Sequence, residues 1–170
     1  MIRKIVIYPD PGLMEVSSTV TDFGEDLQTL VNDMYETVYA APGVGLAAPQ
    51  VGVNKRVVVL DLTAGEEEGN QIVLVNPQVL EEEGMQKEEE GCLSLPDLQA
   101  VVERPARVRV SAQDREGKSF EIEGEGLLAR ALSHEIDHLK GVLYIEKLPF
   151  IKKDLMKRKI KKLIKAGEWY

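Results

Sequence analysis

The chain has 170 residues, of which 44% are hydrophobic and 29% are charged, and these values predict one globular domain over residues 1–170. The net charge of −8 argues against DNA or RNA binding by the surface as a whole. No apolar run approaches the ~18 residues that a membrane span needs, so no membrane partner is expected.

Two further features bear on the compartment. The single cysteine excludes an internal disulfide and favours a reducing environment. The segment 1–7 has no apolar stretch long enough for a signal peptide. We therefore expect a cytoplasmic protein.

The first predicted element is a helix over residues 22–40. Its apolar residues recur at helical spacing, and Asp22 with Glu25 resembles a capping box at its start. The pair Pro42-Gly43 ends it. Strands are predicted over 56–62 and 71–76, and the acidic turn between them at 66–69 is expected to be simply solvated.

The later elements form a second group. Residues 101–112 and 118–123 alternate apolar and polar side chains around the turn 114–117, which predicts a β-hairpin. A helix follows, with Gly124 and Gly126 breaking the strand pattern before it and Gly141 as its stop. Strands that cluster before this helix favour an α+β fold, with antiparallel strands around a central helix and a basic C-terminal helix at about 150–166.

The central helix carries both histidines of the chain, in the phrase His134-Glu135-Ile136-Asp137-His138. Positions i and i+4 lie on one helix face, so both imidazoles can reach one metal ion. Glu135 lies about 100° around the helix, where it can address water at the metal without being a ligand. This H-E-x-x-H arrangement is typical of metal-assisted hydrolases.

The same stripe supports the metal interpretation. Leu127 and Ala131 precede His134 and His138 at spacings typical of a core-facing stripe. Histidines in such positions are costly to bury unless something binds them. The alternative is a structural helix with two buried histidines.

A catalytic metal site needs a third protein ligand and one open position. No further histidine exists, so the third ligand is either a carboxylate or the lone Cys92, in the segment E-G-C-L-S-L-P. Gly91 allows the backbone an unusual conformation or a close approach, and Pro96 is expected to end the extended segment. A lone cysteine is often a small buried hydrophobe, but beside this helix we favour thiolate ligation.

A third phrase, Gly43–Gln50 (G-V-G-L-A-A-P-Q), is glycine-rich and ends in a carboxamide. It lacks the lysine and hydroxyl pattern of a phosphate loop, so nucleotide binding is disfavoured. Its glycines would let a bound peptide pair with it as an added strand. Gln50 could donate an amide N–H to a developing oxyanion. Alone, the phrase also fits a flexible loop.

Taken together, G-V-G-L-A-A-P-Q, E-G-C-L-S and H-E-I-D-H resemble the three signature motifs of bacterial peptide deformylases, in the same order and at similar separations. The segment Tyr8–Pro11 also resembles that family's N-terminal segment. The resemblance implies removal of the formyl group from the N-terminal formyl-methionine of newly made proteins. It further implies metal ligands Cys92, His134 and His138, with Glu135 as the acid and base.

The same resemblance implies the groups that surround the reacting carbon. An oxyanion hole would come from the Gln50 side chain and the Leu93 backbone N–H, while Val44 and Gly45 would bind the peptide backbone. It implies Fe²⁺ as the metal in the cell. Two imidazoles and a thiolate would also suit Zn²⁺, Co²⁺ or Ni²⁺ in purified protein.

One stretch departs from the family pattern. Many members carry an arginine a few residues after E-G-C-L-S, where this chain has Asp97-Leu98-Gln99. A role for such an arginine is therefore in doubt, and Arg104 is not proposed to replace it. Leu127 and Ala131 are candidates for the methionine pocket, with core packing as the alternative.

The C-terminal segment 151–165 carries eight basic side chains against one acidic residue, Asp154. It reads as a basic amphipathic helix whose lysines are either simply solvated or in contact with ribosomal RNA near the exit tunnel. A membrane-surface helix is the third alternative.

Two other functions fit part of the pattern. A zinc peptidase with an acidic third ligand would keep its metal when Cys92 is replaced. A non-enzymatic ribosome- or peptide-binding module with a structural metal would have a closed four-ligand site and would tolerate loss of Glu135.

Overall fold

The larger of two β-sheets has five antiparallel strands in the order β1-β2-β3-β6-β7. The computed structural model describes all 170 residues. The strands of this sheet are β1 (Gly45–Ala47), β2 (Val57–Leu60), β3 (Ile72–Glu83), β6 (Arg107–Gln113) and β7 (Ser119–Glu125). The second sheet is the hairpin of β4 (Gln86–Cys92) and β5 (Leu95–Arg104).

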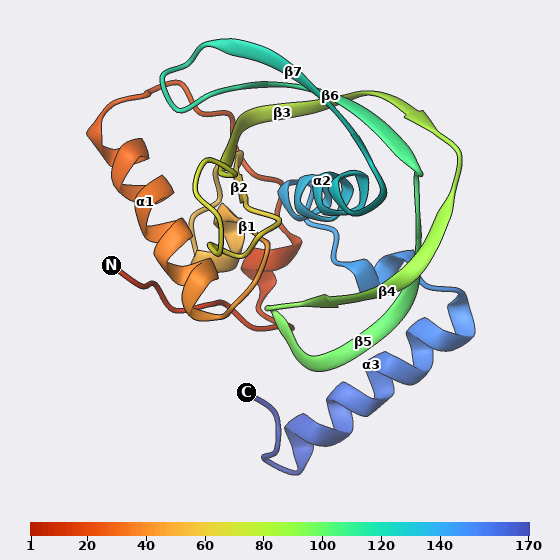
Figure 1. Cartoon of the computed structure of the whole chain (residues 1–170). Helices are drawn as coiled ribbons and strands as arrows, with labels where there is room; N and C mark the ends of the chain where they lie inside the picture. The colour runs from red at the N-terminus through yellow and green to blue at the C-terminus, as the bar shows by residue number, and fades with distance from the viewer.

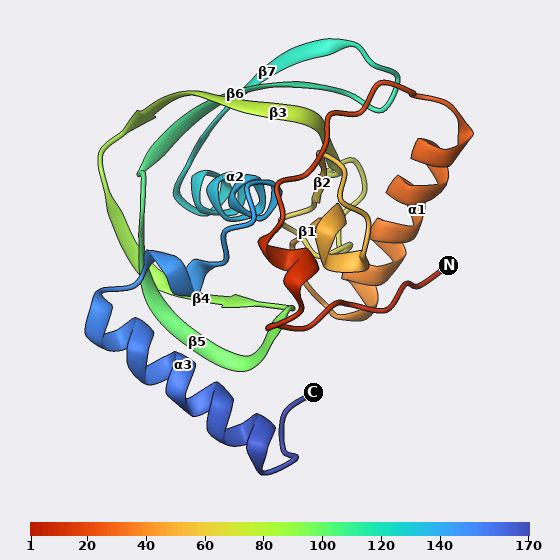
Figure 2. The ribbon, with the colours of Figure 1, turned by 180° about the vertical axis from the view of Figure 1, so that it is seen from behind.

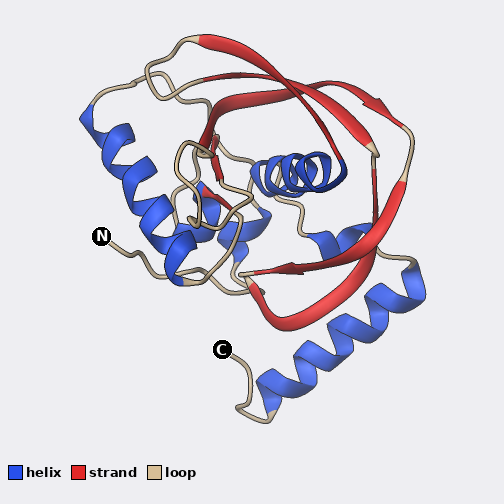
Figure 3. Ribbon diagram, viewed as in Figure 1, coloured by secondary structure: helices blue, strands red, loops and turns tan.

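Three α-helices accompany the sheets: α1 (Glu25–Ala40), α2 (Gly126–Leu139) and α3 (Phe150–Lys165). Figure 1 shows α2 end-on near the centre, with β3, β6 and β7 curving over it and β4 and β5 on its other side. The view from behind agrees, and α1 covers β1 and β2 while α3 lies outside β5 (Figure 2). The predicted α+β fold around a central helix is therefore confirmed, and strands make most of its curved wall (Figure 3).

Short 3-10 turns complete the chain at Pro11–Met14, Ala48–Val51 and Tyr144–Lys147. Apolar side chains fill the space on both sides of the large sheet, with α1 on one side and α2 on the other. A third cluster joins β5 to the turn after α2 and to Ile160 of α3. None of the helices is long and apolar enough to cross a membrane.

The predicted start of α1 is wrong by three residues. The helix begins at Glu25, and its N-cap is Gly24, which offers no capping side chain. Asp22 instead accepts a hydrogen bond from the Gly24 N–H at 2.8 Å, so this local turn replaces the predicted capping box. The helix ends at Ala40, just before Pro42-Gly43, as predicted.

The predicted strands are partly correct. The hairpin of β6 and β7 and the strand β2 are confirmed, but β3 extends seven residues past the predicted end, and β4 was not predicted. The predicted strand 101–112 is two strands, because Pro105 has no N–H to continue the ladder. Pro96 lies inside β5 rather than ending an extended segment; β5 has only β4 beside it, so Pro96 is on an edge strand.

The boundaries of α2 follow its glycines. Gly126 has φ +56° and lets the chain turn directly from β7 into the helix. Gly141 has φ +75°, and a Cβ there would lie 2.4 Å from the carbonyl oxygen of Met14. Gly141 therefore ends the helix as predicted, because no larger residue fits this turn.

Candidate active site

The three predicted metal ligands converge on one point. Cys92 ends β4, and His134 and His138 lie one turn apart on α2. The Cys92 Sγ is 3.4 Å from His138 Nε2, and the two histidine Nε2 atoms are 3.2 Å apart. One ligand atom from each residue lies within 4.8 Å of the others. Strand and helix thus deliver a thiol and two imidazoles to one point.

This donor set fits a tetrahedral metal ion. Bonds of about 2.0–2.3 Å in a tetrahedron place neighbouring ligand atoms about 3.3–3.6 Å apart. The 3.2 Å separation of the two Nε2 atoms and the 3.4 Å separation of Cys92 Sγ from His138 Nε2 are close to that spacing. The three groups are borderline to soft ligands that suit divalent iron, cobalt, nickel or zinc.

A buried carboxylate holds His134 in place. Its Nδ1–H donates to Glu90 Oε1 at 2.7 Å, which turns Nε2 toward Cys92 and His138. Burial opposes protonation of His134, but hydrogen bonds to Cys92 and Glu90 prevail and raise its pKa to about 10. Because only an unprotonated nitrogen can be a ligand, a bound metal ion would displace that proton.

Glu90 is in turn held by two arginines. Arg104 donates to both of its carboxylate oxygens, at 2.8 and 3.0 Å, and also to Asp137 at 2.6 Å. Arg130 donates to Glu90 as well. Burial opposes the ionised form of Glu90, but hydrogen bonds from His134 and Arg104 prevail and lower its pKa to about 2. The carboxylate therefore stays charged and keeps His134 oriented.

Glu135, which the sequence predicts to be the acid and base, lies beside His134. Its Oε1 lies 3.8 Å from His134 Nε2, and its Oε2 is buried without a hydrogen-bond partner. Burial raises its pKa to about 7, close to the value that suits proton transfer in both directions. Gly45 makes room for it, because a Cβ at residue 45 would lie 3.3 Å from Glu135 Cγ and 2.7 Å from Leu60.

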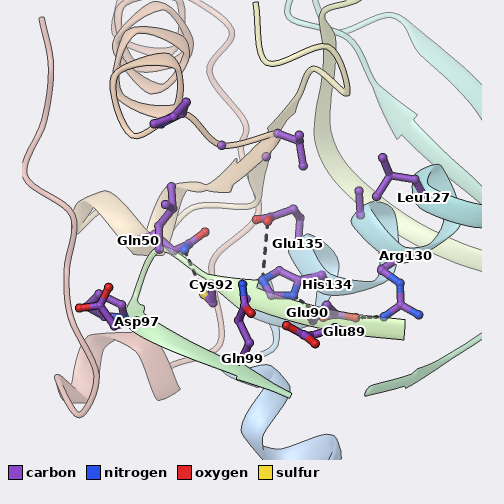
Figure 4. Close-up of a pocket in the computed structure, with 18 residues that line it drawn as sticks. Gln50, Glu89, Glu90, Cys92, Asp97, Gln99, Leu127, Arg130, His134 and Glu135 are labelled. Carbon is purple, nitrogen blue, oxygen red and sulfur yellow. Dashed lines mark hydrogen bonds and ion pairs between the residues drawn. The ribbon is translucent and has the colours of Figure 1, made fainter. Parts of the chain in front are cut away.

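Gln50 is a further polar group at this point. Its Oε1 accepts the Ala47 N–H at 3.0 Å, which fixes the orientation of the amide. Its Nε2 then faces Ser94 Oγ at 3.2 Å and Cys92 Sγ at 3.6 Å. In Figure 4 the Gln50 amide lies next to the Cys92 thiol, and the carboxylate of Glu135 lies next to the His134 imidazole.

These groups line a cavity of about 590 Å³. Its walls come from the loop before β1, the start of β1, the 3-10 turn Ala48–Val51, the β4–β5 hairpin and α2 from Leu127 to Glu135. They include nine of the ten candidate residues named from the sequence: Val44, Gly45, Gln50, Cys92, Leu93, Leu127, Ala131, His134 and Glu135. His138 lies behind the wall, 1% exposed.

The two methionine-pocket candidates have different environments. Leu127 lines the cavity and is 54% exposed, so it is not a core residue, although the predicted stripe would bury it. Ala131 lines the cavity and is buried. Along α2, the predicted stripe therefore begins with two residues that line the cavity and continues with the two histidines that are candidate metal ligands.

Known proteins match this chain over most of its length. The polypeptide deformylase family model matches residues 2–154. The peptide deformylase of Acidobacterium capsulatum is 53% identical over 169 residues, 99% of each chain. The crystal structure of a peptide deformylase from Legionella pneumophila has a TM-score of 0.90 at 47% identity, over 98% of each chain.

This chain belongs to the polypeptide deformylase family. A further relative, the peptide deformylase of Rhizobium meliloti, is 49% identical and aligns over 97% of this chain. Deformylases are hydrolases that remove the N-terminal formyl group from nascent polypeptides, and this chain has that activity. The family is metal-dependent, in agreement with the Cys92, His134 and His138 cluster.

Sequence reasoning missed the support behind the deformylase site. The motif containing Glu90 does not by itself indicate a role for this residue, and the sequence pattern assigns none to Arg104 or Arg130. A usable signal existed, because Arg130 precedes His134 by four residues and shares its helix face. A charge on a face that must bury histidines requires an opposite charge nearby. Neither propensity nor spacing indicates which of 29 acidic residues supplies it.

Proposed function

We propose that this chain catalyses deformylation with one divalent metal ion held by Cys92, His134 and His138, and with Glu135 as the proton carrier. The observation that supports this most is the convergence of three ligand atoms beside an unpartnered, buried carboxylate oxygen at a cavity wall. Three protein ligands leave the fourth tetrahedral position open, as hydrolysis requires.

A divalent ion bound here would act as a Lewis acid that lowers the pKa of water and polarises the formyl oxygen. Fe²⁺ is proposed as the ion in the cell, on family resemblance, and Zn²⁺, Ni²⁺ or Co²⁺ could replace it in purified protein. The buried Glu90 would raise the basicity of His134 as a ligand, through the hydrogen bond to Nδ1.

Glu135 would accept a proton from the attacking water and then donate it to the amine nitrogen that leaves. Both transfers are favourable near neutral pH when the pKa of the carboxyl group lies close to 7. The unpartnered Oε2 gives the carboxylate a free position for that proton.

The formyl oxygen gains negative charge as its carbon becomes tetrahedral, and Gln50 and Leu93 would meet it. The Gln50 amide is already oriented by the Ala47 N–H, so its Nε2 donor needs little rearrangement. The Leu93 backbone N–H follows directly on Cys92 in the hairpin turn. Removal of one such donor in other hydrolases costs about 10²–10³ in kcat.

The peptide would lie along the free edge of β1. This strand pairs with β2 on one side only, and Val44 and Gly45 line the cavity on the other. A substrate chain could therefore add to the edge through backbone hydrogen bonds. Its methionine side chain would contact Leu127 and Ala131, which present apolar surface beside His134.

The test is formate release from a short formyl-methionyl peptide by protein loaded anaerobically with Fe²⁺. We expect turnover by the native chain and a loss of about 10²–10⁴ in Glu135→Gln with metal content unchanged. Absence of formate release from metal-loaded native protein would refute the catalytic proposal.

Cys92→Ala separates this site from the alternatives. We expect it to lose metal, measured by atomic absorption, and the native Co²⁺ form to show thiolate-to-metal absorption that the variant lacks. A zinc peptidase with a carboxylate ligand would keep its metal in Cys92→Ala and would cleave internal peptide bonds. A structural metal module would keep its function in Glu135→Gln.

A cytoplasmic location and a ribosome contact are also proposed. Nascent formylated chains appear at ribosomes. The helix α3 lies on the outside of β5 (Figure 1), and most of its basic side chains are exposed. Phosphate groups of ribosomal RNA would be attracted to that helix.

A further inference from the structure

Ser94 is a buried polar residue that the proposed chemistry leaves without a role. Its exposed fraction is 0%, and its Oγ accepts a hydrogen bond from Gln50 Nε2 at 3.2 Å. A hydroxyl group that is buried without a hydrogen bond costs free energy, and Gln50 supplies the one side-chain hydrogen bond that this hydroxyl makes. The hydroxyl of Ser94 is therefore matched to the amide of Gln50.

The Gln50 amide has one acceptor and two N–H donors, and Ser94 determines where the donors point. Oε1 accepts the Ala47 N–H at 3.0 Å, so a flipped amide would place one donor against another. One Nε2 hydrogen is bonded to Ser94 Oγ. Because the amide is planar, the second hydrogen is then directed to the side of Cys92, whose Sγ lies 3.6 Å from Nε2 (Figure 4).

The position of Ser94 in the hairpin connects it to the other proposed oxyanion donor. Cys92 pairs with Leu95 across β4 and β5, so Leu93 and Ser94 are the two residues of the turn between these strands. The Leu93 backbone N–H is thus one residue from the hydroxyl that holds Gln50. The hydrogen bond between Gln50 and Ser94 ties together two donors that are far apart in the sequence.

The N-terminal segment already fixes the main chains that carry these two side chains. The Val6 N–H donates to the Gln50 carbonyl at 2.7 Å, and the Tyr8 N–H donates to the Ser94 carbonyl at 2.9 Å. These backbone bonds hold the turn Ala48–Val51 beside the tip of the hairpin, but they leave the Gln50 side chain free to rotate. The Ala47 N–H and the Ser94 hydroxyl are the groups that restrain its amide.

We propose that Ser94 is a positioning residue for deformylation, whose hydroxyl takes one amide hydrogen of Gln50 and so directs the other toward the formyl oxygen. This inference rests on the proposed function, because it requires Gln50 to donate to that oxygen in the transition state. Ser94 is not among the residues that line the cavity. It therefore acts through Gln50 and takes no part in the chemical step.

The first test is Ser94→Ala in Fe²⁺-loaded protein with a short formyl-methionyl peptide. The loss of one neutral hydrogen bond should lower kcat about 3- to 10-fold and leave KM and metal content nearly unchanged. The Ser94 carbonyl that accepts the Tyr8 N–H remains in the variant, so the turn should still fold. A fall in kcat/KM that lies entirely in KM would overturn the proposal.

Ser17→Ala is the matched control for the removal of a buried hydroxyl group. Ser17 is 5% exposed, and its Oγ has no hydrogen-bond partner. We expect this variant to keep the native kcat. An equal fall of kcat in Ser17→Ala and Ser94→Ala would assign the effect to general loosening of the fold and would overturn the proposal.

The decisive measurement repeats Ser94→Ala in a Gln50→Ala background. Because Ser94 acts through Gln50, the second change should then lower kcat less than about 2-fold. The same fall of kcat in both backgrounds would refute the positioning role and leave the proposed function intact. A native kcat in Gln50→Ala alone would instead refute the oxyanion role of Gln50, and this inference with it.

A second readout is independent of activity. In isotope-labelled, Zn²⁺-loaded protein, the side-chain amide resonances of Gln50 are identified by their absence from the spectrum of Gln50→Ala. Ser94→Ala should shift both of these resonances, whereas Ser17→Ala should leave them in place. Unchanged resonances in Ser94→Ala would show that the hydroxyl does not hold the amide, and would overturn the proposal.

Discussion

The helices α2 and α3 have similar lengths, 14 and 16 residues, but opposite environments. Ten residues of α2 are buried, and five of them are charged or titratable, whereas α3 buries only Ile160. On α2, Arg130 and His134 are held by Glu90 and Asp137 by Arg104, while most lysines of α3 face solvent. Burial therefore determines whether a charged side chain becomes part of a site or stays available to an outside partner.

The match to the family model also distinguishes α2 from α3. The family model matches residues 2–154, which include all of α2 and only the first turn of α3. The α2 charges are constrained by Glu90, Arg104 and the ligand geometry, so a single change affects several partners. No comparable network constrains α3, which packs mainly against the turn Tyr144–Lys147. Substitutions in α2 and its partners should consequently have larger effects than substitutions in α3.

The largest effect is expected for Glu90→Gln. This change leaves Arg104 and Arg130 buried without their shared counter-charge, which typically destabilises a fold by about 3–5 kcal/mol. It also weakens the hydrogen bond that orients His134, so metal affinity should fall about 10- to 100-fold. Urea unfolding and metal competition with a chelator measure the two effects separately.

Glu88→Gln, on the same strand, serves as the control for Glu90→Gln and should be within about 0.5 kcal/mol of the native chain. Equal stability of Glu90→Gln and this control would contradict the assignment of Glu90 as the centre of the buried network.

Gly45→Ala tests how tightly the cavity positions Glu135. The added Cβ would lie 2.7 Å from Leu60 Cδ2 and 3.3 Å from Glu135 Oε1, so the carboxylate must move. A displacement of this kind should lower kcat by about 10²-fold while metal content stays unchanged. The comparison variant is Gly91→Ala. The nearest atom to its added Cβ would be 3.5 Å away, which is an ordinary contact distance, so this variant should lower kcat less.

Ile160→Ala addresses the only buried residue of α3. The side chain is 1% exposed and packs in the cluster with β5, so its truncation should cost about 2 kcal/mol of unfolding free energy. Ile164→Ala is the control, because Ile164 is 44% exposed and should cost less than about 1 kcal/mol. Deformylation by the folded fraction should stay at the native level in both, and a fall in kcat would show that α3 supports the site directly.

The sequence predicted the grouping of Cys92, His134 and His138 better than it predicted the strands around them. His134 and His138 are four apart on a helix, so helical geometry alone determines their common face, and both boundaries of α2 follow from Gly126 and Gly141. The structure brings Cys92 to the same point, as predicted. Local chemistry of this kind needs no knowledge of the remaining chain.

Features that depend on contacts between residues far apart in the sequence were not predicted. β4 is rich in glutamate and lacks apolar alternation. It becomes a strand because β5 pairs with it and because His134 of α2 donates a hydrogen bond to Glu90. The early start predicted for α1 failed because Asp22 bonds to Gly24 instead of capping the helix. Arg104 lies 33 residues from Asp137 and 14 from Glu90, so only the folded chain reveals their contact.

The smallest stability effect is expected for Lys161→Ala combined with Lys162→Ala. Both side chains are exposed and make no ion pair, so unfolding should change by less than about 0.5 kcal/mol. If α3 contacts ribosomal RNA, however, the same variant should sediment less with ribosomes, and its salt dependence should be shallower. Lys55→Ala with Lys118→Ala removes two exposed charges elsewhere. Equal sedimentation of the two variants would mean that the α3 lysines are simply solvated, whereas a selective loss would show that an exposed helix carries function through its partner.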